Sequence, residues 1–259
     1  MEIKQRSQDS WNADLYDTQH SFVSKYGDHL LDLLAPKAGE KILDLGCGTG
    51  DLAKKLYDSQ VDVVGVDNSA NMVAQAKKKY PAITFAVRDA TDLDFHNEFD
   101  AVFSNATLHW VQSPKQVLTG IYQSLQQEGR FIAEFGGKGN VQAIIDGIIH
   151  GIQEAGFDYN IEQFPWYYPS IGEYTALMEE VGFRVTLAQH YDRPTPLDGD
   201  NGLRDWIVMF GSAFFTGIAE HDKNDILTKI EQQLRPLLYT GGQWVADYKR
   251  IRVIGIKEK

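Results

Sequence analysis

Short apolar runs alternate with amphipathic segments between residues 41 and 135. Each run has the length of a buried strand, whereas the intervening segments carry apolar residues three or four positions apart, as on one face of a helix. The pattern predicts strands at 41–45, 61–66, 83–87, 101–104 and 130–135, with helices at 51–58, 70–80 and 114–125. Strand and helix alternation of this kind is typical of a doubly wound parallel sheet covered by helices.

Helical patterns flank this region on both sides. Apolar positions in 9–34 recur mostly at intervals of three, four or seven, which predicts a helical arm over 1–35. After the glycine-rich stretch 136–140, the pattern predicts helices at 141–155, 171–181, 202–216 and 225–238, and strands at 183–188 and 244–256. We therefore expect a single α/β domain over 1–259, with a Rossmann-like, mostly parallel seven-stranded sheet, a core at 36–136, and helical inserts among the last strands at 137–259.

A glycine-rich turn, Gly46-Cys47-Gly48-Thr49-Gly50, follows the strand at 41–45 and opens a helix. Glycines allow a tight turn and let backbone N–H groups approach a ligand. A dinucleotide fingerprint, G-x-G-x-x-G, would need its third glycine at position 51, where this chain has Asp51. A carboxylate there would repel a pyrophosphate, which disfavours an NAD-dependent reductase.

The G-x-G-x-G spacing, with Asp44 two residues before its first glycine, resembles motif I of the class I S-adenosylmethionine-dependent methyltransferases. Other strand ends fit the same family. Asp67 follows Gly46 by 21 residues, and a carboxylate there can accept two hydrogen bonds from ribose hydroxyls in either class. The resemblance places the adenine amino group at Asp89 and the methionine part of the cofactor beside Asn105.

The resemblance implies S-adenosyl-L-methionine as cofactor and S-adenosyl-L-homocysteine as product. The expected cofactor-binding residues are Asp44, Gly46, Cys47, Gly48, Gly50, Asp67, Asn68, Met72, Asp89, Ala90 and Asn105, with Trp11 and Tyr16 of the arm.

Three further stretches, 104–111, 164–170 and 191–195, look like the branch that contains trans-aconitate methyltransferase and malonyl-carrier-protein O-methyltransferase. Those relatives esterify carboxylates, so the resemblance implies methyl transfer to a small molecule, with a carboxylic acid as the favoured acceptor. Arg193 offers a forked donor set that fits a carboxylate. The expected acceptor pocket, beneath the helical inserts, includes His20, Trp110, Trp166, Tyr167 and Tyr168.

Several alternatives remain open at this point. An amine, phenol or alcohol acceptor would need a base, for which His109 is the candidate, and a carbon acceptor is a further option. A histidine beside Trp110 also fits a plain pocket wall. Arg193 also fits a surface ion pair with Asp192 or Asp198, and the three aromatic residues at 166–168 also fit a hydrophobic core. A protein that binds the cofactor without transferring a methyl group has the same motifs.

Composition narrows the functional classes. A formal net charge of −11 disfavours nucleic acid as the main partner, because that affinity depends on clustered Lys and Arg. Apolar runs are too short to span a bilayer, and the N-terminus lacks the apolar stretch of a secretory signal. The single cysteine, Cys47, excludes an intrachain disulfide and a multi-cysteine zinc site. We expect a cytoplasmic enzyme without a metal; the sequence leaves the oligomeric state open.

Overall fold

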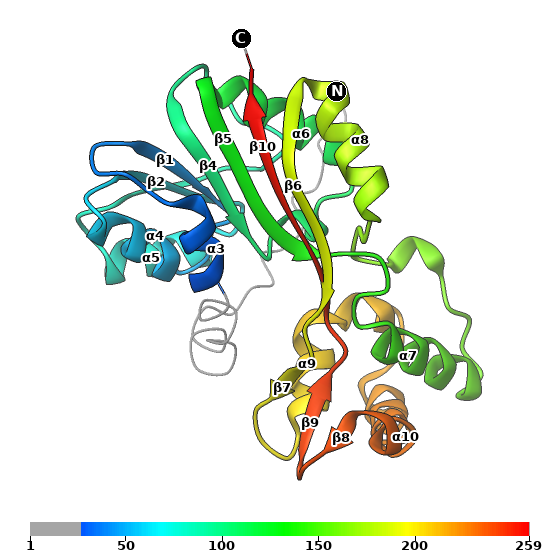
Figure 1. Cartoon of the computed structure of the whole chain (residues 1–259). Helices are drawn as coiled ribbons and strands as arrows, with labels where there is room; N and C mark the ends of the chain where they lie inside the picture. The colour runs from blue at the N-terminus through cyan, green and yellow to red at the C-terminus, as the bar shows by residue number, and fades with distance from the viewer. Residues whose placement is uncertain (1–26, 259) are drawn as a thin grey trace, which may run out of the picture. The chain divides into compact units, whose positions relative to one another are not determined.

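The computed structural model describes residues 27–258, which fall into two compact units (Figure 1). The described part of the first unit comprises 27–135, 171–189 and 252–258, and the second unit comprises 136–170 and 190–251. Most of the helical arm expected over 1–35 lies outside the described residues. Its last part is the helix α3 (Asp28–Leu34).

The first unit is built on a seven-stranded sheet in the order β3-β2-β1-β4-β5-β10-β6. Its strands are β1 (Lys41–Leu45), β2 (Asp62–Asp67), β3 (Thr84–Val87), β4 (Phe99–Asn105), β5 (Leu125–Gly136), β6 (Phe183–Asp192) and β10 (Lys249–Lys257). The pairings of β1 with β2 and β4, of β2 with β3, and of β4 with β5 are all parallel. The expected Rossmann-like, mostly parallel seven-stranded sheet is confirmed.

Three helices bury their apolar sides against one side of this sheet: α3, α4 (Asp51–Asp58) and α5 (Ala70–Lys79). The resulting core combines residues such as Leu30, Leu34, Ile42, Leu56, Val73 and Phe103. Each fully buried aliphatic or aromatic side chain contributes about 1.5–3 kcal/mol. A further helix, α6 (Pro114–Ser124), packs on β4 and on α8 (Ile171–Val181).

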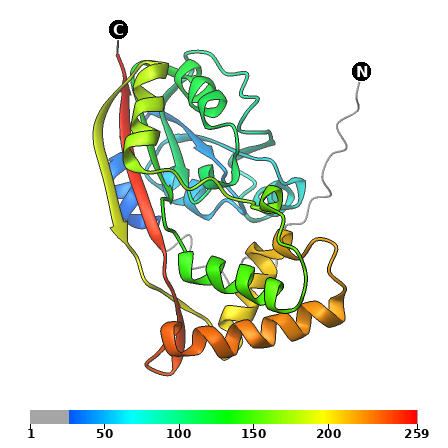
Figure 2. The same cartoon turned by 90° about the vertical axis from the view of Figure 1, so that its right-hand side faces the viewer.

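The second unit combines helices with a small sheet of its own. Its helices are α7 (Gln142–Glu154), α9 (Gly202–Phe210) and α10 (Glu220–Leu238), and its sheet has the order β7 (Thr195–Leu197), β9 (Gln243–Ala246), β8 (Tyr239–Thr240). Two short 3-10 helices, η2 (Ile161–Gln163) and η3 (Ser212–Phe215), complete it. Figures 1 and 2 show α7 and α10 side by side. Glycine permits this approach, because a Cβ on Gly147 would lie 2.9 Å from Leu234 Cδ1.

One expected strand is wrong. The apolar pattern over 244–256 predicts a single strand, whereas the structure divides it into β9 and β10, which belong to different sheets. Asp247 lies between them, where its carboxylate accepts a hydrogen bond from the Ala143 amide at 2.9 Å and its carbonyl accepts one from the Val141 amide at 3.1 Å. These bonds, one to α7 and one to the residue directly before it, replace the β-ladder bonds that would have continued the strand.

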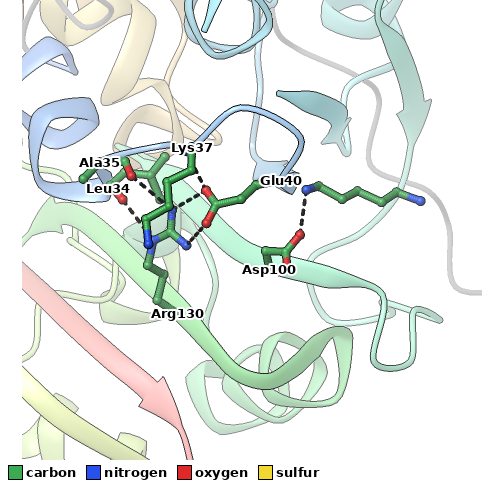
Figure 3. Close-up of polar contacts among 7 residues, drawn as sticks. Leu34, Ala35, Lys37, Glu40, Asp100 and Arg130 are labelled. Carbon is green, nitrogen blue, oxygen red and sulfur yellow. Dashed lines mark hydrogen bonds and ion pairs between the residues drawn. The ribbon is translucent and has the colours of Figure 1, made fainter. Parts of the chain in front are cut away.

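Arg130 of β5 connects the end of α3 to the turn before β1 (Figure 3). Its Nε donates to the Leu34 carbonyl at 2.9 Å, and its two Nη atoms donate to both carboxylate oxygens of Glu40 at 2.8 and 2.7 Å. Glu40 Oε2 also accepts the Lys37 amide at 2.8 Å. Next to it, the Lys41 amide donates to Asp100 Oδ2 at 2.8 Å, which ties the start of β1 to β4.

Replacing Arg130 by methionine is expected to lower the free energy of unfolding by about 2 kcal/mol, because a mostly buried, bidentate pair loses its cation. Burial alone would raise the pKa of Glu40, but the bonds from Arg130 and the Lys37 amide outweigh it and hold that pKa below its ordinary value. A depressed carboxyl pKa adds stability above the unfolded pKa and loses it as the pH falls through the folded one. The difference between variant and wild type, measured by urea unfolding, should therefore shrink from pH 7 to pH 3.5.

The matched control is Arg184→Met, which removes an exposed ion pair with Glu258. Exposed pairs contribute about 0–1 kcal/mol. Equal losses in the two variants would show that the Arg130 contacts have no special stabilising role.

Candidate functional site

Four polar residues mark the carboxyl ends of neighbouring strands. Asp44 is the penultimate residue of β1, Asp67 ends β2, Asp89 follows β3 and Asn105 ends β4. These strands are adjacent in the order β3-β2-β1-β4 and run parallel, so their carboxyl ends share one edge of the sheet. Ligands of open α/β sheets bind at that edge. The structure thus groups along one edge the side chains that the sequence distributes over some sixty residues.

The glycine-rich loop is held against the end of β2. The amides of Gly46 and Cys47 both donate to the Val66 carbonyl, at 2.7 and 3.0 Å, and the Gly48 amide donates to Asp67 Oδ2 at 3.0 Å. Gly50, which directly precedes α4, closes the turn with a 3.0 Å bond from its amide to the Cys47 carbonyl. The loop is therefore preorganised at the start of a helix.

Gly46 and Gly48 of this loop differ in the space that surrounds them. Gly46 has φ +79°, and a Cβ there would lie 2.0 Å from Thr107 Oγ1, so no side chain fits. Gly48 has φ +53°, and a Cβ there would have no heavy atom of residues 27–258 within 4 Å. The positive φ alone favours glycine at this position, and the space beside Gly48 is open to the approach of a ligand to its backbone.

Asp44 is a buried carboxylate, with 2% of its surface exposed, and its Oδ2 has no hydrogen-bond partner among residues 27–258. Burial, followed by the charge of Asp67, raises the pKa of Asp44 to about 7. Asp67 itself is satisfied on both oxygens, by the amides of Gly48 and Ser69 at 3.0 and 2.9 Å. Two carboxylates beside an open glycine loop match a ligand that carries positive charge and oppose a pyrophosphate.

The raised pKa of Asp44 predicts how the stability of the cofactor-free protein depends on pH. Relative to an ordinary aspartate, this group favours folding below its unfolded pKa, and that contribution is lost as the pH rises through about 7. Compared with Asp44→Asn, the wild type should therefore lose about 1.4 kcal/mol of unfolding free energy between pH 6 and pH 8. Denaturant titrations of both proteins at the two pH values measure this; parallel pH profiles would contradict a titrating Asp44.

The residues expected at the adenine end occupy the next strand and helix. Asp89 is exposed, and its Oδ1 accepts from the amide and the hydroxyl of Thr91 at 2.8 and 2.7 Å. Ala90 is buried, and Met72 of α5 is 3% exposed. Asn68 lies exposed directly after β2. The second oxygen of Asp89 leaves acceptor capacity for a ligand.

The segment after β4 lies directly against the glycine loop. Thr107 Oγ1 donates to the Gly46 carbonyl at 3.3 Å, and the short 3-10 helix η1 (Leu108–Trp110) follows. Within η1, His109 is 7% exposed, with its ring centroid 5.5 Å from that of Trp110. His109 is therefore a buried side chain, two residues after Thr107, which contacts the glycine-rich loop.

The remaining expected residues belong to the second unit or lie beyond the part of the chain that the structure describes. Trp166 is 3% exposed and stacks on Tyr168 with centroids 5.6 Å apart, and Tyr167 between them is half-buried. Arg193 follows β6, and its amide donates to the Tyr248 carbonyl at 2.7 Å. Trp11, Tyr16 and His20 are outside the described residues.

Sequence reasoning missed Thr107, Tyr248 and Arg250. Thr107 has a local signal, since it follows the strand end at Asn105 by two residues. Arg250, by contrast, lies in an alternating strand pattern in which a charged residue is expected to face solvent, yet it is 3% exposed. Its burial depends on segments from elsewhere in the second unit.

Residues 43–133 match the family described as "Methyltransferase domain". Over nearly its whole length the chain is 33% identical to an uncharacterized methyltransferase of Schizosaccharomyces pombe, an alignment that covers 97% of this chain and 99% of that protein. Among residues 27–258, no helix is long and apolar enough to cross a membrane.

Partial similarity extends to enzymes with different acceptors. The chain is 37% identical over 127 residues to demethylmenaquinone methyltransferase of Beutenbergia cavernae, covering 46% of this chain and 53% of that one. It is 32% identical over 126 residues to malonyl-[acyl-carrier protein] O-methyltransferase of Acetivibrio thermocellus, covering 46% and 44%.

A solved structure supports the fold. A phosphoethanolamine N-methyltransferase of Haemonchus contortus, in complex with S-adenosylhomocysteine, superimposes with a TM-score of 0.58 at 18% identity, covering 91% of this chain and 53% of that chain. The sheet order, the glycine-rich loop after β1 and the similarity to a methyltransferase over the full length all indicate the same family. The chain belongs to the class I S-adenosylmethionine-dependent methyltransferases.

Proposed function

We propose that this methyltransferase transfers the methyl group of S-adenosylmethionine to a carboxylate oxygen of a small acceptor, with a methyl ester as product. The observation that carries the proposal is the inward placement of Arg193. Its Nε is buried, while the neighbouring Asp192 forms an ion pair with Lys249, with Oδ1 and Nζ 3.6 Å apart. A half-buried guanidinium with a buried Nε supports recognition of an anionic acceptor. The partial similarity to a malonyl-[acyl-carrier protein] O-methyltransferase supports the same acceptor class.

The cofactor fits the edge formed by β3, β2, β1 and β4. The carboxylate oxygen of Asp44 that lacks a partner among residues 27–258 suits the positive charges of the methionine part, and the space over Gly48 admits a close ligand. We assign Asp67 and Asn68 to the ribose, and Met72, Asp89 and Ala90 to the adenine. Gly46, Cys47, Gly48, Gly50 and Asn105 would surround the methionine part. When bound, the cofactor supplies an electrophilic methyl group on a sulfonium.

The proposed chemistry makes few demands on the chain. A carboxylate is ionised at neutral pH and supplies the electron pair of the new C–O bond, while the pair of the broken C–S bond stays on sulfur. No proton has to move. The side chains therefore orient the acceptor and exclude water, and Arg193 contributes to the orientation. We keep Trp110 of the first unit and, separately, Trp166, Tyr167 and Tyr168 of the second unit as candidates for contact with the acceptor.

A second candidate is methylation of a hydroxyl, nitrogen or carbon acceptor. The partial similarity to demethylmenaquinone methyltransferase and the interior position of His109 favour it, because such an acceptor has a proton to lose. A protein that binds the cofactor without turnover is the remaining rival.

The test incubates the full chain with S-adenosylmethionine and, separately, butyrate, succinate, propane-1,2,3-tricarboxylate and catechol. Formation of S-adenosylhomocysteine and of a base-labile methyl ester is measured by mass spectrometry. We expect esters from at least one carboxylate, and undiminished turnover in His109→Gln. Turnover with catechol alone that His109→Gln abolishes would select the second candidate. Cofactor binding without any product would select the non-catalytic rival.

A further inference from the structure

The carboxylate of Asp51, the first residue of α4 after the glycine-rich loop, is bound by the end of α5. Its Oδ1 accepts the hydroxyl of Tyr80 at 2.6 Å and lies 2.7 Å from Nζ of Lys79. Lys79 is the last residue of α5, and Tyr80 follows it directly. The residue type alone indicated only that Asp51 disfavours a pyrophosphate, whereas these contacts connect the start of α4 to the end of α5.

Lys79 also contacts the loop itself. Its Nζ donates to Thr49 Oγ1 at 3.3 Å, and Thr49, which lies inside the loop, is 2% exposed. One ammonium group therefore binds both a loop residue and the first residue of the helix that follows. We call Thr49, Asp51, Lys79 and Tyr80 the loop clamp. All four residues belong to the first unit.

The backbone at Gly50 lies directly against α5 and β3. Gly50 has φ +88°, and a Cβ there would lie 2.8 Å from Phe85 Cζ and 3.1 Å from Tyr80 Cδ2. No side chain fits in this space, so the turn packs with its bare backbone. The ring of Tyr80 thus packs on the same turn that its hydroxyl holds through Asp51.

The loop is held on two sides. On one side, the amides of Gly46, Cys47 and Gly48 donate to the end of β2, and on the other side the loop clamp connects the loop to α5. The space beside Gly48 stays open within residues 27–258. A loop that is already ordered loses less conformational entropy when a ligand binds, and this preorganisation raises the affinity.

The ion pair of the loop clamp is too exposed to stabilise the whole protein strongly. The side chains of Asp51 and Lys79 are 33% and 25% exposed, and pairs in contact with water contribute little to the free energy of unfolding. Local order is a separate quantity, because single segments can open while the rest of a domain stays folded. Loss of the loop clamp should therefore loosen the loop and leave the sheet intact.

We propose that Asp51, Lys79 and Tyr80 are positioning residues for methyl transfer, which hold the glycine-rich loop in the conformation that binds S-adenosylmethionine and do not contact the cofactor themselves. They act through Thr49 and through the turn at Gly50. The inference rests on the proposed function, which assigns this loop to the methionine part of the cofactor. It gives Asp51 a role in cofactor affinity that is independent of its effect on other ligands.

Calorimetric titration of the full chain with S-adenosylhomocysteine tests the inference. Lys79→Met and Asp51→Asn should each weaken binding about fivefold or more, and Tyr80→Phe, which keeps the ring and loses the hydroxyl, about threefold. Because Asp51 and Lys79 act on one another, the double variant should bind about as well as the weaker of the two single variants. Lys79→Arg keeps a cation and should recover most of the affinity, which a loss of packing alone does not explain.

Lys54→Met is the matched control, since it removes another ion pair of α4, with Asp58 at the far end of that helix. It should bind S-adenosylhomocysteine like the wild type. Wild-type affinity in both Lys79→Met and Asp51→Asn, an equal loss of affinity in Lys54→Met, or no recovery in Lys79→Arg would overturn the inference.

Amide hydrogen exchange of the cofactor-free protein separates this inference from the proposed function. The amides of Gly46, Cys47 and Gly48 are hydrogen-bonded, so peptides that contain the loop should exchange slowly in the wild type and faster in Lys79→Met, with β4 and β5 equally protected in both. Faster loop exchange in the variant, with no cofactor binding by the wild type, would contradict the proposed function. Cofactor binding by the wild type, with unchanged loop exchange and affinity in the variant, would overturn the inference and leave the proposed function intact.

Discussion

Replacing Asp44 by asparagine is expected to weaken binding of S-adenosylmethionine about 100-fold at pH 8. The carboxylate is 2% exposed and its Oδ2 has no hydrogen-bond partner among residues 27–258, so a cationic ligand gains a desolvated counter-charge there. A charge-assisted interaction of this kind is worth about 3 kcal/mol, and each 1.4 kcal/mol changes an affinity about tenfold. Calorimetric titration at pH 8 measures the effect.

The pH dependence of S-adenosylmethionine binding tests whether Asp44 is the group that binds the cofactor. Since the pKa of Asp44 is raised to about 7 in the free protein, the wild type should lose close to tenfold in affinity from pH 8 to pH 6 as this carboxyl takes up a proton. Asp44→Asn should show no such loss. Asp62→Asn, an exposed aspartate at the opposite end of β2, is the control and should bind normally. An unchanged affinity in Asp44→Asn would remove Asp44 from the cofactor site.

Replacing Gly48 by alanine should weaken cofactor binding at least 30-fold while the protein still folds. Its φ of +53° makes a side chain cost about 1 kcal/mol, and a Cβ there meets no heavy atom within 4 Å in the described part of the chain. The methyl group would occupy the space through which a ligand approaches the loop backbone. The measurements are calorimetric titration with S-adenosylmethionine and thermal unfolding.

Gly39→Ala provides the matched comparison. Gly39 also has a positive φ, of +85°, and a Cβ there would likewise have no heavy atom within 4 Å among the residues that the structure describes. It lies in the turn before β1, away from the loop. Both variants should lose a similar amount of stability, and Gly48→Ala alone should lose affinity. Equal affinities would show that the ligand does not approach the Gly48 backbone.

Local patterns in the sequence predicted the first half of the sheet well. The strand at 41–45 and the helix at 51–58 have the same bounds in the structure, and the strands that follow differ by a few residues at their ends. The β1–β2, β2–β3 and β4–β5 pairs join strands that follow one another in the chain, so apolar periodicity and short connections predict them, whereas the β1–β4 pair depends on the fold class. The glycine loop was equally visible, because its function depends on residue type at consecutive positions.

The grouping of the proposed cofactor residues at one edge of the sheet was predictable for a related reason. Parallel strands end at one edge, so a polar residue at each strand end needs only the fold class to be placed beside the others. The electrostatic properties of Asp44 were not predictable from the sequence. The raised pKa of Asp44 follows from burial and from the charge of Asp67, and its Oδ2 finds no partner within residues 27–258; neither property is visible in the order of residues along the chain.

Local sequence patterns did not predict the strand boundaries and the buried charges of the second unit, which depend on its tertiary structure. Nothing in the apolar pattern over 244–256 separates β9 from β10, because the bonds that end one and start the other come from residues about a hundred positions away, such as the Asn140 to Lys249 pair. The burial of Arg250 has the same origin, since Tyr168, from a distant segment of the chain, comes near its charge only in the folded unit. Sequence by itself thus determined the fold class, the position of the glycine-rich turn and the family, which rest on local periodicity and consecutive motifs. Only the tertiary structure decided where the last strand pairs and which charges become interior, because both depend on contacts between distant segments.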